Sequence, residues 1–574
     1  MMQNKNLSVE ESLTLAIQNH QKNNFEIAQD LYEKILKISP DHFKVIFLLG
    51  TLSAQTKNFD RAKQLLQKAI QIQPNNVDAH NNLGSVQKET GENQKAINSY
   101  KKVIQINPNY SSAYNNLGTV YKEIGEQQKA ISCFEKAIQI NPNYVEAHNN
   151  LGVVLKEVGK YQKAINCFER AIENQPNFRL AHQNLMDIYE VTNQEKELRT
   201  AILKARTLLK DNPITKLFEG ILLNRNEKFV EAKKCLETIS FKASEINKEI
   251  LRFSTLAKCY DRIGDSDKAF SYFTKTNNLV LQQTDVKIFN KNRYLQKIKT
   301  RRKFFTKSKV NKWSNLKLSD KRQDPTFLVG FPRSGTTLLD TILDSHPMIE
   351  VLEEKNMVEK FINSLSELPS GGLDDLENMQ SDQLKKIRDI YFNSLEQMVK
   401  NKDNSKLYID KLPLNIIYVG EIFRIFPNAK FILSLRHPCD CVLSCFMQNF
   451  KLNDAMANFL SLDDAAYLYD SVMNLWTQYT SIFSINYYEI KYENVVENLE
   501  STVRSILNFL ELPWDNSVLE YLKTAKKRDR IATPSYTQVI KPIYSHASGR
   551  WKRYIKKNSN IYSILEPWIK KFNY

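Results

Sequence analysis

Residues 329–338 have the sequence VGFPRSGTTL and separate two segments of different periodicity. The preceding residues, 325–329 (PTFLV), predict a short buried strand, and residues 336–343 (TTLLDTIL) carry apolar side chains at helical spacing. Glycines in such a loop let the backbone approach a ligand, and the free N–H groups of the helix start attract an anion. We therefore expect an anion-binding loop, with a tight strand–helix turn that binds nothing as the alternative.

The loop departs from the nucleotide-triphosphate motif G-x-x-x-x-G-K-[ST] at one position. Gly330 and Gly335 occupy the glycine positions, but Thr336 stands where the motif has lysine, and Thr337 follows it. The cation lies inside the loop instead, at Arg333. A triphosphate site uses that lysine and Mg²⁺ against the phosphate charge, so this loop suits a less heavily charged group. A kinase or NTPase remains an alternative that the missing lysine disfavours.

The sequence PRSGTT after a strand resembles the 5′-phosphosulfate loop of sulfotransferases, which use 3′-phosphoadenosine-5′-phosphosulfate (PAPS) as the donor. The resemblance implies that Arg333, Ser334, Gly335, Thr336 and Thr337 bind the donor. It also implies direct transfer without a metal, in which Arg333 stabilises charge on the bridging and sulfuryl oxygens.

Strand and helix patterns alternate after this loop. Three apolar runs predict strands, and three longer segments predict helices. The strands are 407–410, 429–435 and 487–492, and the helices are 381–400, 453–480 and 497–510. Such alternation predicts an α/β domain with a mainly parallel sheet, in which ligands bind at the carboxyl ends of the strands.

A second anion motif follows the predicted strand 429–435. Arg436 comes directly after the strand, and Ser444 lies eight residues later on the next helix. A guanidinium suits a phosphate because it donates two parallel hydrogen bonds, although a surface salt bridge is the alternative for a single arginine. The spacing matches the 3′-phosphate site of sulfotransferases. Tyrosylprotein sulfotransferases have a second arginine where this chain has Gln448, so part of the 3′-phosphate affinity must come from elsewhere.

Further positions resemble the tyrosylprotein sulfotransferases in chain order. The pair Glu353-Glu354 corresponds to the glutamates that carry the catalytic base, which would be Glu354. Glu353 and His346 stay open as competing bases from the same stretch. Lys411 corresponds to the active-site lysine that stabilises charge in transfer, and Tyr492 begins the segment that packs on the adenine.

Residues 542–554 (PIYSHASGRWKRY) resemble a closing segment that adds a serine and basic groups to the site. Ser548 is the nearest serine, one residue out of register, and the resemblance implies that it is a catalytic residue. Lys552 is the basic residue that would bind the donor. The resemblance covers roughly 325–555. The tyrosylprotein enzymes, which are luminal, have cysteines where this chain has Val351 and Ile409, and that difference fits a reducing compartment.

The N-terminal half repeats every 34 residues. The recurring small residues and prolines are Pro40, Pro74, Pro108, Pro142 and Pro176, Gly50, Gly84, Gly118 and Gly152, and Ala28, Ala62, Ala96, Ala130 and Ala164. Small residues where helices cross and a proline at the end of each unit resemble the tetratricopeptide repeat (TPR), a helical hairpin. We expect seven or eight units over residues 9–283, degenerate after 178, forming a superhelix with a concave groove.

One asparagine recurs at an equivalent position of successive repeats. The four residues are Asn82, Asn116, Asn150 and Asn184. Each amide offers a donor and an acceptor, so a ladder of them can bind an extended peptide backbone. The ladder resembles the groove of the O-linked N-acetylglucosamine transferase repeats and implies a protein or peptide acceptor. The alternative is that these side chains bond neighbouring helices or face water.

Residues 284–324 join the two parts and are strongly basic. Residues 285–324 contain fourteen Lys or Arg and three Asp, so 14 − 3 = +11 of the net charge of +17. We expect a solvated connecting helix and linker; a positive collar that collects an acidic substrate is the alternative. Nucleic acid is disfavoured because no aromatic-basic pattern occurs.

The cysteine pattern and the N-terminus predict a cytoplasmic protein. Seven cysteines form no C-x-x-C pair, and residues 1–18 lack the apolar core of a signal peptide. No run of 18 apolar residues predicts a membrane span.

The sequence as a whole predicts an all-α TPR superhelix followed by an α/β, P-loop-like sulfotransferase domain at 325–574. The predicted enzyme moves a sulfuryl group from PAPS to an acceptor hydroxyl, on a protein tyrosine held by the groove. Carbohydrate and small phenols stay open as acceptors. A non-enzymatic TPR adaptor with an inert nucleotide-binding domain is the second alternative.

Overall fold

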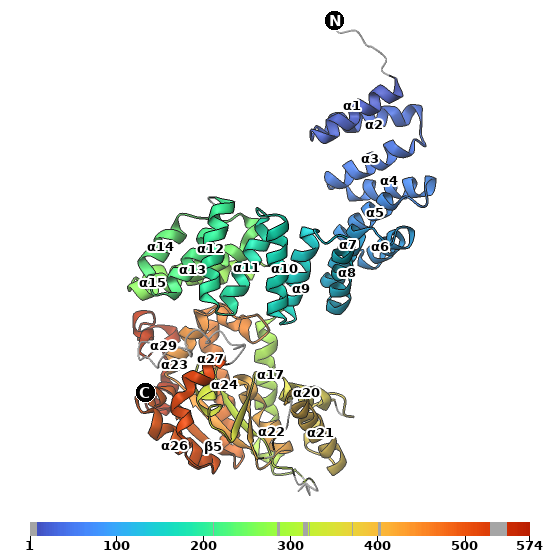
Figure 1. Ribbon diagram of the computed structural model, residues 1–574. Helices are drawn as coiled ribbons and strands as arrows, with labels where there is room; N and C mark the ends of the chain where they lie inside the picture. Colours follow the sequence, from blue (N-terminus) through green and yellow to red (C-terminus); the bar gives the residue numbers. More distant parts are fainter. Residues whose placement is uncertain are drawn as a thin grey trace. The chain divides into compact units, whose positions relative to one another are not determined.

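A computed structural model describes residues 8–210, 212–283, 288–313, 320, 322–369, 371–399, 403, 405–527 and 548–574. The chain forms two compact units, Met1–Glu219 and Gly220–Tyr574 (Figure 1). The second unit therefore holds residues 220–283 together with the C-terminal domain. Whether the repeat array ends at 283 stays a prediction, because compactness does not define repeat membership.

The first unit consists of helices in the part of it that the structure describes. They are α1 (Val9–Gln21), α2 (Phe25–Ile38), α3 (Phe43–Gln55), α4 (Phe59–Ile72), α5 (Val77–Glu89), α6 (Asn93–Ile106), α7 (Ser111–Glu123), α8 (Gln127–Ile140), α9 (Val145–Glu157), α10 (Tyr161–Asn174), α11 (Arg179–Val191) and α12 (Glu195–Leu209). The next helix, α13 (Pro213–Arg225), spans the boundary between the units.

The recurring glycines allow the two helices of each hairpin to pack closely. A Cβ atom on Gly118 would lie 2.8 Å from the ring of Phe134, and one on Gly152 would lie 2.6 Å from Phe168. Both aromatic rings are fully buried. The 34-residue spacing therefore preserves a contact between a glycine on the first helix and a large side chain on the second.

The second unit combines helices with one parallel sheet. The helices are α14 (Phe229–Glu237), α15 (Ile246–Ile263), α16 (Ser266–Gln282), α17 (Lys291–Phe304), α18 (Lys307–Val310), α19 (Thr336–Leu343), α20 (Met357–Leu365), α21 (Ser381–Met398), α22 (Val419–Ile425), α23 (Pro438–Phe446), α24 (Leu462–Ile482), α25 (Tyr492–Glu497), α26 (Leu499–Leu510), α27 (Tyr521–Lys527) and α29 (Asn560–Lys571). The strands are β1 (Thr326–Gly330), β2 (Ile349–Glu353), β3 (Leu407–Lys411), β4 (Lys430–Leu435) and β5 (Asn486–Lys491).

The strand order is β2-β3-β1-β4-β5, and every neighbouring pair is parallel. The register aligns Glu353 with Lys411 and Gly330 with Ser434. The carboxyl ends of all five strands therefore meet at one edge, where a parallel sheet places its ligand site. A helical repeat region followed by this α/β domain confirms the predicted fold class.

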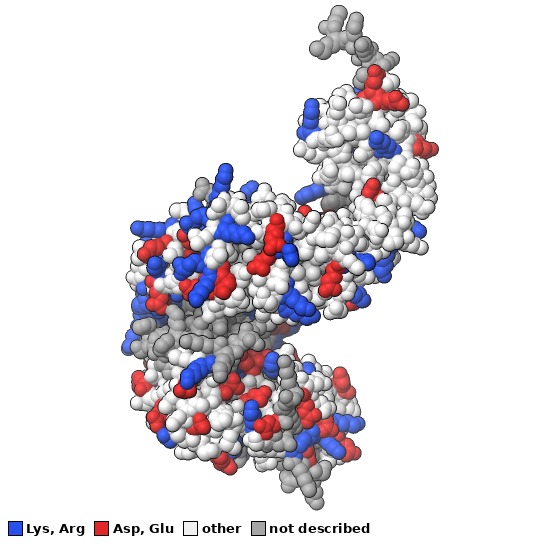
Figure 2. Space-filling view, viewed as in Figure 1, with Lys and Arg blue, Asp and Glu red and all other residues white. Residues whose placement is uncertain are grey.

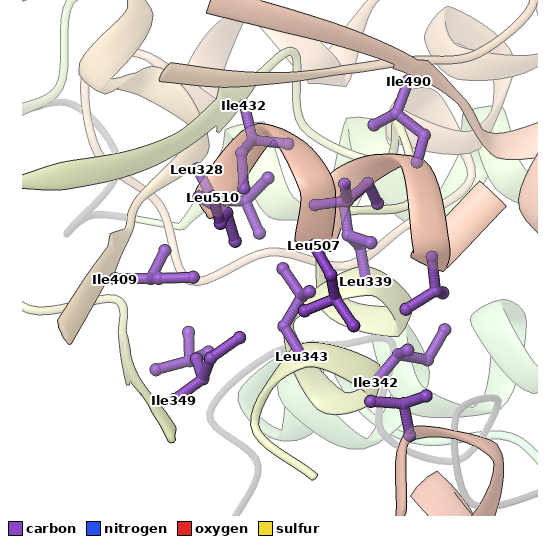
Figure 3. Close-up of a cluster of buried hydrophobic side chains, with 14 of the residues drawn as sticks. Leu328, Leu339, Ile342, Leu343, Ile349, Ile409, Ile432, Ile490, Leu507 and Leu510 are labelled. Carbon is purple, nitrogen blue, oxygen red and sulfur yellow. The ribbon is translucent and has the colours of Figure 1, made fainter. Parts of the chain in front are cut away.

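Apolar side chains cover both faces of the sheet. On one face, Leu328, Ile409 and Ile432 pack against α19 and α26 (Figure 3). On the other face, Phe327 stacks on Phe431 with ring centroids 5.4 Å apart. Because successive strand residues point to opposite faces, the runs that predicted buried strands supply both layers.

Two sequence expectations need correction, and one strand was missed. The strand β2 (Ile349–Glu353) was not predicted, and the expected helix 453–480 is divided into a 3₁₀ turn at Met456–Leu460 and α24. The basic segment is not simply a solvated connection. Its helix α17 buries Tyr294 and Ile298, and Arg301 forms a buried ion pair of 2.8 Å with Glu421. One face of this helix is thus part of the core.

Candidate functional site

The glycine loop links β1 directly to α19. Gly335 caps the helix with φ of 101°, a conformation that favours glycine, and Arg333 also adopts a positive φ of 69°. A Cβ on Gly335 would lie 2.7 Å from the ring of Tyr492, so this tyrosine packs on the loop. The loop therefore needs glycine here for two reasons, its backbone conformation and the close approach of Tyr492.

The interior of the loop is polar and tightly enclosed. Ser334 is 1% exposed, and its hydroxyl has no hydrogen-bond partner among the described residues. Thr336 and Thr337 are buried in the first turn of α19, where backbone N–H groups have no partner within the helix. A buried hydroxyl beside a helix start fits an oxyanion, because both donate hydrogen bonds to it.

The two predicted anion motifs contact each other. Arg333 donates from Nε to the Ser444 hydroxyl at 3.1 Å, and Arg436 donates from Nη1 to the Arg333 carbonyl at 3.2 Å. Ser444 lies on α23, which begins just after Arg436 at the end of β4. The structure thus brings together the loop and the arginine–serine motif.

Helix α23 also contacts the backbone of the glycine loop. Cys441 and Cys445 donate from Sγ to the Pro332 carbonyl at 3.1 and 3.2 Å. Burial raises the pKa of Cys441 to about 12, so this thiol stays protonated at neutral pH. These cysteines are structural donors, a role that their sequence spacing did not suggest.

His437 and Asp440 fix the start of α23. The imidazole of His437 accepts from the Cys439 N–H at 3.3 Å, and burial lowers the pKa of His437 to about 4. Asp440 accepts from the backbone N–H groups of Gly549 and Trp551 at 2.6 and 2.8 Å. The segment at 548–554, which we call the closing segment, therefore docks on this helix.

Lys411 lies at the centre of three carboxylates. Its Nζ atom is 3.1 Å from Asp340, 3.2 Å from Glu353 and 3.4 Å from Glu354, and its side chain is 0% exposed. Burial alone would lower the pKa of Lys411, but Asp340, Glu353 and Glu354 together raise it. The lysine is therefore charged, as stabilisation of a developing negative charge requires.

The two glutamates occupy different positions. Glu353 ends β2, and its side chain is 13% exposed, whereas the Glu354 side chain is 33% exposed. Glu354 takes a positive φ of 50°, and its N–H donates to the Lys411 carbonyl at 2.8 Å. Glu354 is thus the more accessible carboxylate. His346 is buried with Nε2 2.9 Å from the Pro513 carbonyl, so this competing base packs just beyond the end of α19.

The two predicted residues of the closing segment lie at the protein surface. Ser548 and Lys552 are exposed, and the Lys552 charge contributes to the lowered pKa of His437. The Arg436 guanidinium lies over the Tyr492 ring at 4.9 Å. Residues 542–547 of the resembling segment lie outside the described residues.

Asp340 is a site residue that the sequence analysis missed. It lies on α19, four residues after Thr336, and is 0% exposed. The helical spacing of four could have placed it on the same face as the loop threonine. Its partner Lys411 comes from β3, so only the folded chain shows the pair.

The asparagine ladder bonds successive repeats. Asn116, Asn150 and Asn184 each donate from Nδ2 to the asparagine 35 positions earlier, at 3.1, 3.0 and 2.9 Å. Asn82 donates to Thr51 at 3.1 Å. The amide nitrogens therefore bond neighbouring helices, which was the alternative interpretation of the ladder. Each of the four side chains is nevertheless partly exposed.

The described residues carry basic and acidic side chains on one shared surface. On the face in Figure 2, basic and acidic side chains are interspersed and form no single large basic patch. No group of three or more His, Cys, Asp or Glu side chains in the described ranges has the arrangement of a metal site. Across the same ranges, no helix has the length and apolar character needed to span a bilayer.

Family comparisons match both parts of the chain. Residues 325–516 match the description "Sulfotransferase family". Residues 20–85 and 145–178 match "Tetratricopeptide repeat", and residues 88–125 and 118–159 match "TPR repeat". The match to the sulfotransferase family contains the loop, the glutamate pair, Lys411 and the arginine–serine motif.

Relatives are similar over part of their length. An uncharacterized protein of Aquifex aeolicus is 31% identical over 328 residues, which is 55% of this chain and 41% of that protein. Protein-tyrosine sulfotransferase 1 of Danio rerio is 26% identical over 43% of this chain and 71% of its own length. A tetratricopeptide repeat protein structure from Parabacteroides merdae is 19% identical, with 44% of this chain and 98% of that chain covered and a TM-score of 0.35.

Proposed function

We propose that this chain, which joins tetratricopeptide repeats to a sulfotransferase-family domain, transfers a sulfuryl group from PAPS to a hydroxyl group, with a protein tyrosine as the preferred acceptor. The observation that carries the proposal is the junction of the two anion motifs. Arg333 contacts Ser444, and Arg436 contacts the Arg333 carbonyl, so one ligand with a 5′ and a 3′ anionic group fits both.

PAPS would supply an activated sulfuryl group with a good leaving group. In the proposed site, Ser334, Gly335, Thr336 and Thr337 bind the 5′ end through hydroxyl and backbone N–H groups. Arg436 and Ser444 bind the 3′-phosphate by charge-assisted and neutral hydrogen bonds. Tyr492 packs on the loop and lies beneath the Arg436 guanidinium, and an adenine contact is its proposed role.

The acceptor hydroxyl requires a base, and Glu354 is the proposed one. A hydroxyl becomes nucleophilic as its proton leaves, and an accessible carboxylate at the carboxyl edge of the sheet can take that proton. Lys411 and Arg333 would stabilise the negative charge on the transferred group and on the bridging oxygen. The ion pairs of Lys411 hold the ammonium at the same edge as Glu354 before any ligand binds.

Ser548 and Lys552 have a weaker place in the proposal. Both belong to the closing segment, which docks on α23 through Asp440. Their exposure is compatible with contact to a ligand that reaches the end of this helix. We propose that Ser548 takes part in catalysis and that Lys552 binds the donor.

The acceptor is proposed to be a protein because the repeats offer a polar ladder. The carbonyl oxygens of Asn82, Asn116, Asn150 and Asn184 are the atoms that would accept from a peptide backbone. The amide nitrogens already bond neighbouring repeats, so the ladder is held in place before a peptide binds.

A reducing compartment, such as the cytoplasm, is part of the same proposal. All seven cysteines are free thiols in the structure. Val351 and Ile409 stand where the resembling luminal enzymes have cysteines. These observations support a protein that does not depend on disulfides.

The test is transfer of ³⁵S-labelled sulfate from PAPS into a lysate, followed by identification of the labelled species. Labelled protein that releases tyrosine sulfate on hydrolysis is the expected result. Thermal shift with the product 3′,5′-adenosine bisphosphate (PAP), against ATP with Mg²⁺, separates the alternatives. Stabilisation by ATP with Mg²⁺ but not by PAP would favour a kinase or NTPase. PAP binding without any labelled product would favour an inert adaptor.

A further inference from the structure

Asp261, near the end of α15, binds the closing segment. It is 5% exposed, and its carboxylate contacts Arg550 at 2.8 Å, Arg553 at 3.0 Å and the Tyr554 hydroxyl at 2.6 Å. Its backbone carbonyl accepts a further bond from Arg553 at 3.1 Å. A buried carboxylate with this many partners fixes the segment, because loss of the charge would leave two guanidinium groups without their counter-ion.

The same closing segment holds the start of α23. Its Gly549 and Trp551 N–H groups donate to Asp440, and the Trp551 ring stacks on His437 at 4.9 Å between centroids. His437 directly follows Arg436, the proposed ligand of the 3′-phosphate. Asp261 is therefore linked to Arg436 through a short chain of packed and hydrogen-bonded groups.

Helix α16 holds the other end of α23. Asn277 donates from Nδ2 to the Phe446 carbonyl at 3.1 Å, and the Phe270 ring stacks on Phe446 at 5.3 Å. Phe446 is the last residue of α23, and an uncapped carbonyl at a buried helix end costs free energy. The hairpin α15–α16 thus contacts α23 at its C-terminal end directly and at its N-terminal end through the closing segment.

We propose that the hairpin α15–α16 is a positioning element of the donor site, with Asp261 fixing the closing segment so that Arg436 and Ser444 face the glycine loop. The proposal rests on the proposed function, since it assigns the 3′-phosphate to α23. Under this proposal, helices that precede the transferase domain in the sequence affect donor affinity. Other helices of the same N-terminal region offer the proposed surface for the acceptor. Asp261 touches no ligand and acts through the closing segment.

The test measures nucleotide binding by calorimetry in the full chain with Asp261→Asn. PAP and AMP differ only in the 3′-phosphate, so they separate α23 from the glycine loop. We expect PAP binding to weaken by about two- to thirtyfold, as for other residues that act through packed networks, and AMP binding to stay unchanged. In an Arg436→Ala background, Asp261→Asn should have a smaller further effect on PAP binding, because only Ser444 then remains to be positioned.

Controls make each outcome decisive. Asp267→Asn removes the same charge from an exposed position of α16 and should leave both affinities unchanged. If Asp261→Asn does not fold, Tyr554→Phe removes one of its bonds and should weaken PAP binding to a smaller extent. Equal weakening of PAP and AMP, or unchanged PAP binding, would overturn the positioning role alone. A wild-type chain that binds no PAP would overturn both this proposal and the proposed function.

Discussion

The guanidinium of Arg436 donates to the backbone carbonyl of Arg333 across 3.2 Å, although the residues are 103 positions apart. One arginine thus orients the loop that carries the other. The bond sets the distance between the two proposed anion sites, because Arg333 also contacts Ser444 on α23.

The first prediction concerns Arg436→Ala. Loss of a charge-assisted hydrogen bond of about 1.5–3 kcal/mol should weaken PAP binding by about one to two orders of magnitude. AMP, which lacks the 3′-phosphate, should bind nearly as before. Calorimetry with both nucleotides checks this. Arg504→Ala is the control, since Arg504 contacts Glu500 and the Trp514 ring at the surface of α26. Parallel losses for PAP and AMP would remove Arg436 from its proposed role.

The second prediction concerns the identity of the base. Glu354→Gln keeps the side-chain size and removes the basicity, so kcat should fall by about 10²–10⁴ while PAP affinity stays within a factor of a few. Glu353→Gln should cost less, because this side chain is less accessible. Steady-state kinetics of both variants decide the matter. Near-normal turnover of Glu354→Gln with loss in Glu353→Gln would assign the base to Glu353.

The third prediction concerns Asp340→Asn. Removal of one anionic neighbour should lower the pKa of Lys411, because Asp340 is the largest of the three charges that raise it. The basic limb of the kcat–pH profile should move to lower pH, and kcat should fall about tenfold. Asp340→Glu should restore part of the rate, and Asp382→Asn, an exposed change on α21, is the control. A reduced kcat with an unmoved pH profile would mean that Asp340 is purely structural.

The fourth prediction concerns the asparagine ladder. Changing Asn116 and Asn150 together to Ala removes two bonds between repeats, each contributing about 0.5–1.5 kcal/mol, so the melting temperature of the repeats should fall. Below that temperature, KM for a protein acceptor should rise severalfold, and kcat/KM for a small phenol should not change. Asn98→Ala, an exposed change on α6, is the control. A lower melting temperature with unchanged KM would leave the ladder a framework only.

The fifth prediction concerns pH and stability. Burial raises the pKa of Asp410 to about 8, and Tyr391 donates to this carboxyl at 3.3 Å. The unfolded carboxyl titrates near 4, so the folded state takes up a proton between pH 4 and 8. This contribution to stability is complete below pH 4 and is lost as the pH rises to 8, by about 1.4 kcal/mol per pH unit.

Asp410→Asn removes that titration. Between pH 5 and 7, the free energy of unfolding of the variant should therefore fall by about 2–3 kcal/mol less than that of the wild type. Urea denaturation followed by tryptophan fluorescence is suitable, since all five tryptophans lie after residue 219 and report the second unit. Parallel curves for the two proteins would show that Asp410 is ionised in the folded state.

The loop and the helix that follows it could be predicted because residues adjacent in the sequence determine both. Residues 336–343 form the expected helix, and β1 ends at Gly330 as the loop begins. The strand β2 escaped prediction since its short run, Ile349–Glu353, mixes apolar side chains with two glutamates. The division of residues 453–480 reflects Ser461, whose hydroxyl caps α24 at the Asp464 N–H.

Candidate site residues that belong to a sequence motif could be predicted. Those that come together only through the tertiary fold could not. The glutamate pair and Lys411 were found in order, but their ion pairs depend on the register of β2 and β3. Asp340 joins this cluster from a helix, and no sequence spacing relates it to a lysine 71 positions later. The contact of Asp261 with the closing segment is still less local, since nearly 300 residues separate the partners.

The asparagine hydrogen bonds between successive repeats all run in one direction, since the asparagine of the later repeat donates to that of the earlier repeat. A duplicated copy of residues 111–144 would therefore receive a donor from the next unit and give one to the unit before it. Inserting a whole 34-residue unit therefore keeps each donor asparagine opposite an acceptor asparagine. The array can thus lengthen or shorten in steps of one unit without redesign of its neighbours. Gene duplication could change the reach of such a chain toward larger targets while its chemistry stays the same.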